Sequence, residues 1–165
     1  MKNILLIGCG HMGGSLMSGW SNSKNYTISV IDKKKYAILK KRNRNKKIKF
    51  FKSIDDINNQ NNLDYIIFAT RPLELTNVFK ELKNANFNKK SIAISVIAGK
   101  KTEIFKKNLL NISKIVRVMP NMPALIGEGV HCIYTNKSIN KKEINEIDKL
   151  FSLSGKTIFF NSETF

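Results

Sequence analysis

A glycine-rich turn near the N-terminus carries the clearest chemistry in this sequence. Glycine stands at its first, third and sixth positions, and its residues are Gly8, Cys9, Gly10, His11, Met12 and Gly13. A buried-type apolar run, residues 2–8, precedes the turn, and apolar residues at helical spacing follow it over residues 11–20. In such a unit the first glycine permits the tight turn, the second lets a diphosphate approach the backbone, and the third lets helix and strand pack closely. The spacing therefore predicts a dinucleotide-binding site, with the phosphates at the helix N-terminus.

The second predicted strand, residues 26–32, ends in an acidic residue, Asp32. At this place a carboxylate can bind the 2′-hydroxyl of an adenosine ribose, which favours NAD. Lys33, Lys34 and Lys35 follow directly, and a cation there could instead bind the 2′-phosphate of NADP. Exposed charge at the start of a helix explains these lysines equally well, so the residues alone leave the choice between the two cofactors open.

Two further junctions follow predicted buried strands over residues 64–69 and 92–97. The first comprises Ala69, Thr70, Arg71 and Pro72, and the second ends in Ala98 and Gly99. Open α/β sheets bind their ligands at the carboxyl ends of the strands, and small residues there would let a nicotinamide ring lie close to the backbone. Each junction taken alone is equally typical of an ordinary link between a strand and a loop.

A loop with two prolines follows another predicted strand, residues 115–119. Pro120 and Pro123 flank Asn121 and restrict the backbone on both sides of it. In the predicted fold this loop lies at the same sheet edge as the other junctions.

The elements that must position these residues alternate along the chain. Strands are predicted over residues 2–8, 26–32, 47–51, 64–69, 92–97, 115–119, 129–134 and 156–160. Helices are predicted over residues 11–20, 34–42, 72–82, 102–110 and 140–153. The second is expected to bury Tyr36, Ile38 and Leu39. The last is expected to open with a capping box of Asn140 and Glu143 and to terminate at Gly155. This rhythm is typical of an α/β fold with a Rossmann-type, doubly wound, mostly parallel sheet and helices on both faces. Residues 1–165 are expected to form one NAD(P)-binding domain.

The composition of the chain excludes several classes of protein. It has 165 residues and a formal charge of +17, carried almost entirely by lysine. Lysine, asparagine and isoleucine all have A/T-rich codons, so genome composition explains the excess better than a nucleic-acid partner, which would favour arginine and aromatic residues. No apolar run is long enough to span a membrane, and two cysteines without a CxxC pair exclude a disulfide scaffold. We expect a cytoplasmic protein without specific nucleic-acid binding or membrane attachment.

Taken together, the motifs resemble the pyrroline-5-carboxylate reductase family. The glycine turn, the junction at residues 69–72, the Ser-x-Ile-Ala-Gly junction at residues 95–99 and the Arg-x-Met-Pro-Asn-x-Pro loop at residues 117–123 occur in the family's order. The resemblance implies an enzyme of proline biosynthesis that reduces 1-pyrroline-5-carboxylate to L-proline with NAD(P)H, and family habit favours NADPH over NADH. It also implies that residues 7–12, Ile7 included, bind the pyrophosphate. Ala69–Pro72 would contact the nicotinamide-side ribose, and Ala98, Gly99 and Asn121 would line the nicotinamide.

The chain departs from the family in two ways. Thr70-Arg71 replaces the usual Val-Lys, His11 stands where Asn or Gln is common, and Met122 where Thr is common. No segment matches the family's all-helical C-terminal domain, which forms the homo-oligomer and holds the substrate carboxylate. We therefore expect a truncated chain, a fragment or a chain that needs a partner, with little activity alone.

The remaining candidate roles are few. Neither His11 nor His131 has further ligands nearby in sequence, so no metal site is predicted, and no residue is assigned a catalytic role. Two alternatives stay open: a non-catalytic dinucleotide-binding module, and another small dehydrogenase of the 3-hydroxyacid or prephenate type. The proline-flanked Asn121 loop favours the reductase over the other dehydrogenases.

Overall fold

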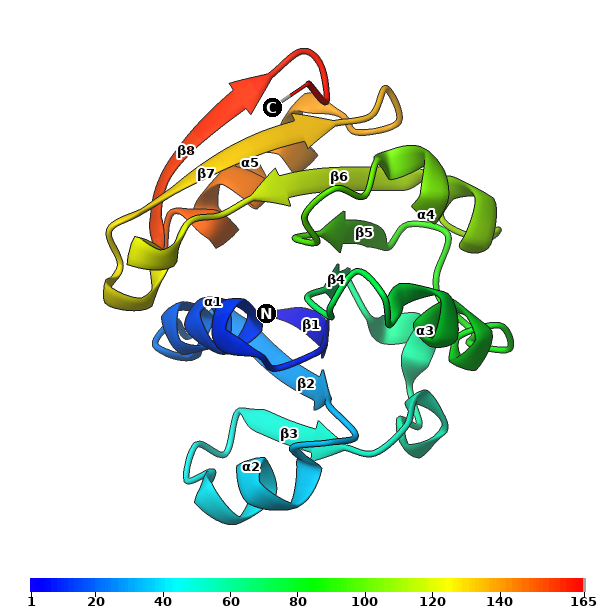
Figure 1. Ribbon diagram of the computed structural model, residues 1–165, viewed down its shortest axis with the longest axis vertical. Coiled ribbons are helices and arrows are strands. Elements are labelled where there is room, and N and C mark those ends of the chain that lie inside the picture. The colour runs from blue at the N-terminus through cyan, green and yellow to red at the C-terminus, as the bar shows by residue number, and fades with distance from the viewer. Residues whose placement is uncertain (165) are drawn as a thin grey trace.

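The central sheet of the computed structural model, which describes residues 1–164, has the strand order β3-β2-β1-β4-β5-β6-β7-β8 (Figure 1). Its strands are β1 (Lys2–Ile7), β2 (Tyr26–Ile31), β3 (Ile48–Phe51), β4 (Tyr65–Phe68), β5 (Ile92–Ser95), β6 (Lys114–Met119), β7 (Gly129–Thr135) and β8 (Gly155–Phe160). The α-helices are α1 (His11–Ser21), α2 (Tyr36–Arg42), α3 (Leu75–Glu81), α4 (Thr102–Asn108) and α5 (Lys141–Phe151). Strands β1 to β6 are mutually parallel. The predicted α/β fold with a mostly parallel sheet is confirmed.

The sheet reverses direction at β7. This strand pairs antiparallel with β6, and β8 then pairs parallel with β7. The link from β6 to β7 covers only residues 120–128, which contain the short 3₁₀ helix η3 (Met122–Ile126). A parallel neighbour needs a crossover of about a dozen residues or more, so this short link enforces the reversal.

Two apolar cores lie on opposite faces of the sheet. Alternate residues of β1 divide between them: Ile4 and Leu6 face the core under α1 and α5, whereas Leu5 and Ile7 face the core under α3 and α4. Both faces of the central strands are therefore covered, which explains why the apolar run at the N-terminus shows no polar alternation. None of the helices between residues 1 and 164 is long and apolar enough to cross a membrane.

Helix α1 packs against α5 through its Trp20 side chain. The indole N–H of Trp20 donates a hydrogen bond of 3.1 Å to the carbonyl of Leu150, and the Trp20 ring meets the Phe151 ring edge-on at 6.1 Å. Both partners of Trp20 belong to α5. Packing between segments that are 130 residues apart in the chain therefore positions the helix that follows the glycine turn.

Three local expectations were wrong. Helix α2 buries none of its residues, and Ile38 is 55% exposed. Helix α3 begins at Leu75 because residues 72–74 form a turn after Pro72. Helix α5 ends at Phe151, and Gly155 instead opens β8, where a Cβ atom would lie 2.0 Å from the Gly129 carbonyl oxygen. The capping box of α5 is confirmed in both of its hydrogen bonds.

A buried histidine lies between α5 and the sheet. His131 of β7 is fully inaccessible to solvent, and its Nε2 atom lies 3.0 Å from the hydroxyl oxygen of Ser154. Its Nδ1 atom has no hydrogen-bond partner among the described residues. Burial lowers the pKa of His131 from its ordinary value of 6.5, because charging the ring there would remove an ion from water. The imidazole is therefore neutral in the folded protein at neutral pH.

This histidine predicts acid sensitivity near neutral pH. Below about pH 6.5 the unfolded chain protonates residue 131, while the folded chain resists protonation until its lower pKa is reached. The free energy of unfolding should thus fall as the pH drops through this window, by at most about 1.4 kcal/mol per pH unit. Urea unfolding at several pH values measures the slope. His131→Gln should flatten it and His11→Gln, at an exposed position, should not; a slope unchanged by His131→Gln would contradict the assignment.

Candidate functional site

The predicted site residues meet at one edge of the sheet. The register pairs Ile7 with both Ile31 and Phe68, Phe68 with Ser95, and Ser95 with Arg117, so the segments that follow these strands all leave the sheet on the same side. Residues 8–13 follow β1, Asp32 and Lys33 follow β2, residues 69–72 follow β4, Ala98 and Gly99 follow β5, and Asn121 follows β6. This is the carboxyl edge, where open α/β sheets bind ligands.

Two glycines of the turn are required by the chain itself. Gly8 has φ of +93°, and a Cβ atom there would lie 2.7 Å from the carbonyl oxygen of Ala69. A Cβ atom on Gly13 would lie 2.3 Å from the carbonyl oxygen of Gly8. Neither position can hold a side chain without moving backbone, so these glycines let β1, α1 and the residue after β4 pack closely together.

Gly10 differs from its two neighbours. Its φ of −72° and ψ of −161° are open to any residue, and a Cβ atom there would meet no atom within 4 Å. It is the N-cap of α1, which has no side-chain cap and no acidic residue in its first turn. The bare backbone of Gly10 therefore leaves space beside uncapped N–H groups, which is the arrangement that a phosphate needs.

The Asp32 carboxylate ties the turn to the end of β2. One of its oxygens accepts the backbone N–H of Cys9 at 2.8 Å, and the other accepts the backbone N–H of Lys35 at 3.0 Å. Each carboxylate oxygen can accept a second hydrogen bond, so Asp32 can also bind a ribose hydroxyl. Burial, with the Asp32 charge nearby, raises the pKa of the Cys9 thiol. Cys9 is accordingly a protonated, small residue in the turn and no nucleophile.

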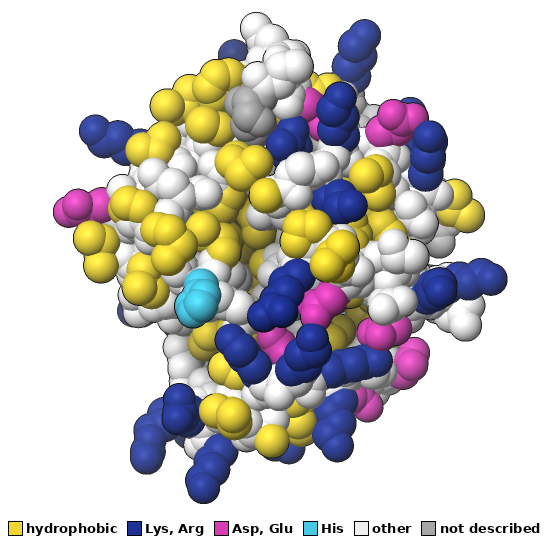
Figure 2. Space-filling view, viewed as in Figure 1, with side chains coloured by type: hydrophobic (Ala, Val, Ile, Leu, Met, Phe, Trp, Pro, Cys, Tyr) yellow, Lys and Arg dark blue, Asp and Glu magenta, His cyan; other side chains and the backbone are white. Residues whose placement is uncertain are grey.

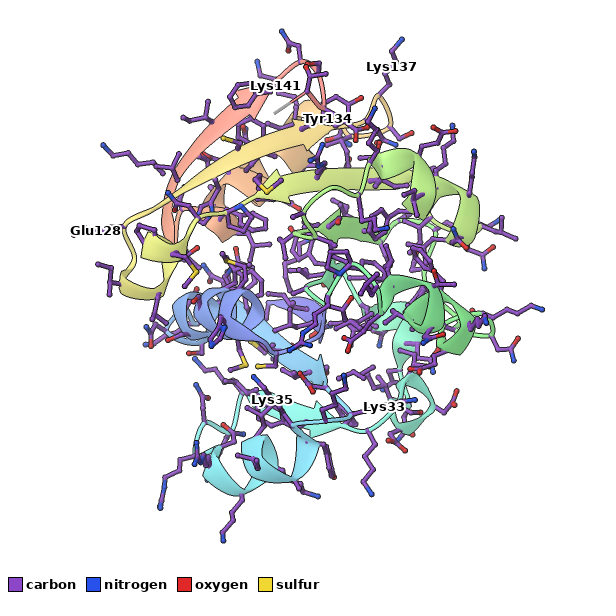
Figure 3. The ribbon with its side chains drawn as sticks, viewed as in Figure 1. Lys33, Lys35, Glu128, Tyr134, Lys137 and Lys141 are labelled. Carbon is purple, nitrogen blue, oxygen red and sulfur yellow. The ribbon has the colours of Figure 1, made fainter. Side chains whose placement is uncertain are left out.

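Each lysine after Asp32 contacts an acceptor. Lys33 Nζ lies 2.7 Å from a carboxylate oxygen of Glu81, and Lys34 Nζ lies 2.6 Å from one of Glu74. Lys35 Nζ donates to the carbonyl of Cys9 at 3.1 Å. Figure 3 marks Lys33 and Lys35 below the end of β2. Ion pairs this exposed contribute little and are readily exchanged, so the carboxylates of Glu74 and Glu81 do not prevent the lysines from turning to a phosphate.

A groove runs along this edge as two adjoining cavities of about 310 and 270 Å³. Both are lined by Gly8, Asp32, Lys34, Thr70 and Glu74. The Thr70 hydroxyl is buried and has no hydrogen-bond partner among residues 1–164. A buried hydroxyl without a partner is costly, so it marks a place where a ligand would complete the structure.

One wall of this groove was missed by the sequence analysis. Glu74, Asn77, Val78 and Glu81 of the α3 segment line the second cavity. Their spacing of three, one and three residues places them along one side of a helix, adjacent to the side that buries Leu75 and Phe79. That spacing is the signal that could have found them.

The proline-flanked loop is held by its central asparagine. The side-chain oxygen of Asn121 accepts the backbone N–H of Val130 at 2.8 Å, which fixes the entry to η3 and the start of β7. The next turn closes at Gly127, whose φ is +80°. Apolar side chains gather over η3 at the left of Figure 2, where Met122, Leu125 and Ile126 are exposed. Asn121 therefore supports an apolar loop at the same sheet edge, but Ala98, Gly99 and Asn121 line neither of the two cavities.

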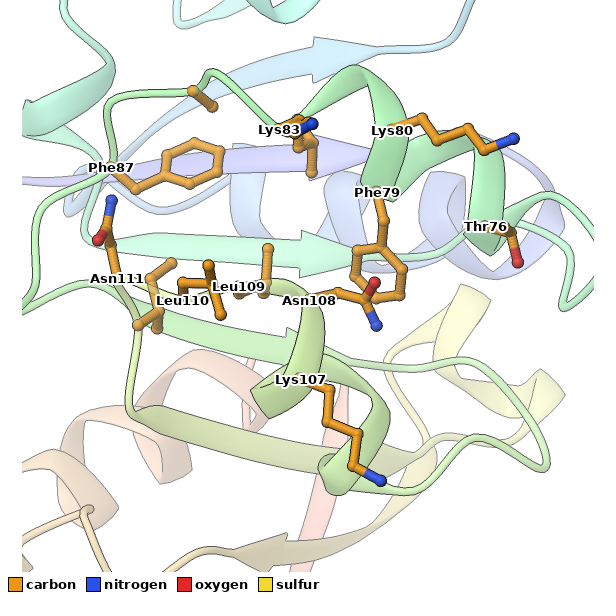
Figure 4. A pocket seen from close by; sticks show the side chains of 13 residues that line it. Thr76, Phe79, Lys80, Lys83, Phe87, Lys107, Asn108, Leu109, Leu110 and Asn111 are labelled. Carbon is orange, nitrogen blue, oxygen red and sulfur yellow. The ribbon is translucent and has the colours of Figure 1, made fainter.

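A separate cavity of about 470 Å³ lies between the C-terminal ends of α3 and α4 (Figure 4). Phe79, Phe87 and Leu109 form its apolar lining, with Lys80 and Lys107 in the last turns of the two helices. Lysines in this position offset the negative ends of the helix dipoles, so they need no ligand. None of the predicted site residues lines this cavity. Within the described part of the chain, no group of three or more His, Cys, Asp and Glu side chains could hold a metal ion.

Comparison with known proteins agrees with this fold. Residues 3–99 match the family described as NADP oxidoreductase coenzyme F420-dependent. Pyrroline-5-carboxylate reductase of Haemophilus influenzae is 29% identical over 99% of this chain, which spans 59% of that protein. A solved pyrroline-5-carboxylate reductase of Coxiella burnetii aligns with a TM-score of 0.82 and 25% identity, over 98% of this chain and 60% of that one. An NADP-bound pyrroline carboxylate reductase of Plasmodium falciparum shares the fold, with a TM-score of 0.75 and 22% identity over 97% of this chain and 58% of that one.

Proposed function

This chain belongs to the family described as NADP oxidoreductase coenzyme F420-dependent, and from that membership we propose that it is the cofactor-binding part of a 1-pyrroline-5-carboxylate reductase. The observation that carries the proposal is the meeting of four strand-end segments, each with a counterpart in that enzyme family, at one sheet edge. The similarity to the Haemophilus influenzae reductase over 99% of the chain supports it.

In the proposed site the glycine turn binds the pyrophosphate. Gly10 leaves room for it, the N–H groups that open α1 donate to it, and Asp32 faces the adenosine ribose. The buried Thr70 hydroxyl would find its missing partner on the cofactor's ribose or phosphate oxygens. Ala98, Gly99 and Asn121 would line the nicotinamide. The open cradle at Gly10 and the unpartnered Thr70 hydroxyl both fit a dinucleotide.

The chemistry divides between cofactor and protein. The bound cofactor supplies a hydride to the imine carbon of the substrate. The residues of this chain orient the cofactor and shield one side of it from water, and we assign none of them as a general acid. Fluorescence titration with NADPH tests the binding: saturation is expected, and a failure to saturate would overturn the proposal.

Substrate binding is proposed to need more than the residues described. The chain spans 59% of the Haemophilus influenzae relative, and the resemblance assigns the substrate carboxylate and the oligomer contacts to a helical domain of the family. Ile158, Phe159 and Phe160 of β8 are 47%, 39% and 39% exposed, an apolar strip at the edge of the sheet. We propose that this strip makes the isolated chain prone to association.

NADPH is proposed as the preferred cofactor. If Lys33 and Lys34 leave Glu81 and Glu74 for a 2′-phosphate, NADPH should bind about tenfold more tightly than NADH at low salt. The difference should shrink as salt rises, because exposed charges are screened within about 10 Å at 0.1 M. Titrations with both cofactors at two salt concentrations measure this.

Lys33→Gln should reduce the preference for NADPH. Lys137→Gln is the matched control, because Lys137 is also exposed and lies at the far end of the molecule in Figure 3. Equal affinities for NADH and NADPH at low salt would show that these lysines are exposed surface charges that do not bind the 2′-phosphate.

A further inference from the structure

The segment that follows β8 turns back across the sheet and reaches α4. The backbone N–H of Thr102, the first residue of α4, donates to a carboxylate oxygen of Glu163 at 2.9 Å. The Thr102 hydroxyl donates to the other oxygen of the same carboxylate. The N-cap residue of α4, Lys101, makes no side-chain cap. Glu163 therefore caps α4 from 61 residues away in the chain.

Glu163 is also bound to a buried arginine. Arg117 of β6 is 5% exposed, and its Nη1 atom donates to the Glu163 carbonyl at 2.7 Å and lies 4.0 Å from its carboxylate. A guanidinium this deeply buried must be paired and hydrogen-bonded, because its desolvation is expensive. Arg117 thus fixes the backbone of Glu163 while the side chain caps α4.

These contacts determine the position of one short turn. Ile97 is buried in the core under α3 and α4, and Thr102 is held by Glu163. Between them, Ala98 and Gly99 form a tight turn with Gly99 at φ of +70°, and Lys100 and Lys101 lead from it into α4. With both ends fixed, this four-residue segment has little freedom to move.

We propose that Glu163 is a positioning residue for the nicotinamide side of the cofactor site. It acts through Thr102 by holding the turn that contains Ala98 and Gly99 at the carboxyl edge of β5, and Arg117 serves this role by anchoring Glu163. The inference rests on the proposed function, and it gives a role to Glu163 and Arg117, to which the proposed function assigns none. Helix α4 has only seven residues, too few to be stable alone, so loss of its cap loosens the turn before it.

The experiment compares two ligands that share the adenosine part. NADPH carries the nicotinamide, whereas 2′-phospho-ADP-ribose lacks it. Glu163→Gln removes the charge and one acceptor. It should weaken NADPH binding about tenfold, the ratio that a loss of about 1.4 kcal/mol produces, and change binding of the fragment less than about twofold. Equilibrium titration of both ligands against the folded chain measures this.

Glu103→Gln is the matched control. Glu103 lies in the first turn of the same helix, but its carboxylate pairs with Lys107 on the surface. This variant loses the same charge near the same helix end and should bind both ligands like the unsubstituted chain.

The possible results distinguish a failure of this inference from a failure of the proposed function. Selective loss of NADPH affinity in Glu163→Gln supports the proposal, and fragment binding shows that the variant is folded. Unchanged NADPH binding, or equal loss for both ligands, overturns it while the proposed function stands. If the unsubstituted chain binds neither ligand, the proposed function fails and this inference falls with it.

Discussion

A Gly10→Val variant should fold like the unsubstituted chain and lose at least about hundredfold in NADPH affinity, about 2.7 kcal/mol. The backbone at Gly10 is open to any residue, and a Cβ atom there meets nothing within 4 Å, so the fold accepts the side chain. The added methyl groups would occupy the space beside the N–H groups that open α1. A diphosphate could then no longer approach the backbone of the turn. Fluorescence titration gives the affinity, and circular dichroism with thermal unfolding gives the fold.

Gly14→Val is the control for this variant. Gly14 lies one turn further along α1, its Cβ atom would also meet nothing within 4 Å, and it does not line the groove. The control adds the same side chain to the same helix at a position outside the groove, where valine is tolerated at least as well as glycine, and it should keep its NADPH affinity. A folded Gly10→Val chain with normal affinity would remove the glycine turn from the proposed site.

The isolated chain should reduce 1-pyrroline-5-carboxylate at least about a thousandfold more slowly than the same chain fused to a helical domain from a relative, a difference of about 4 kcal/mol. Holding two reactants in the right orientation can lower a barrier by about 7–11 kcal/mol. In the proposed arrangement this chain orients only the cofactor. Oxidation of NADPH in the presence of substrate, followed by absorbance, measures the rate.

The comparison is valid only if the fusion raises the rate of 1-pyrroline-5-carboxylate reduction without changing cofactor binding. NADPH should bind the isolated chain and the fusion alike, and the fusion should also form the oligomer and cover the apolar strip on β8. A well-behaved isolated chain with the turnover of the fusion would contradict the prediction. The residues assigned here to the nicotinamide would then also bind the substrate.

Most of the fold and the location of the groove could be predicted because they depend on local patterns. Apolar runs without alternation identify strands buried on both faces, and parallel topology then places the carboxyl ends of β1 to β6 at one edge. The positions of Gly8 and Gly13 follow the same logic, since their close contacts join neighbouring elements. The reversal at β7 was also readable in principle, from the short link over residues 120–128.

What the sequence could not predict depends on contacts between distant segments. The Asp32 carboxylate binds the backbone of Cys9, a use that the motif does not specify. Glu163 looks like any polar residue near the end of a strand until the fold brings it to Thr102 and Arg117. Ile38 is likewise exposed although its spacing on α2 resembles that of a buried residue. Helical spacing predicts which face a helix could bury, and only the tertiary structure decides whether anything covers it.

The contact between Trp20 and α5 has a consequence for the order in which the protein is made. A ribosome releases the glycine turn and α1 early, but the carbonyl that accepts the indole N–H belongs to Leu150. A nascent chain shorter than that can pack α1 on the early strands but lacks the contacts that α5 makes with Trp20. The helix that follows the glycine turn is thus encoded before residue 22, but its packing is completed only after residues 150 and 151 have been made. Because Trp20 is the only tryptophan, its fluorescence reports the moment of completion without any added label.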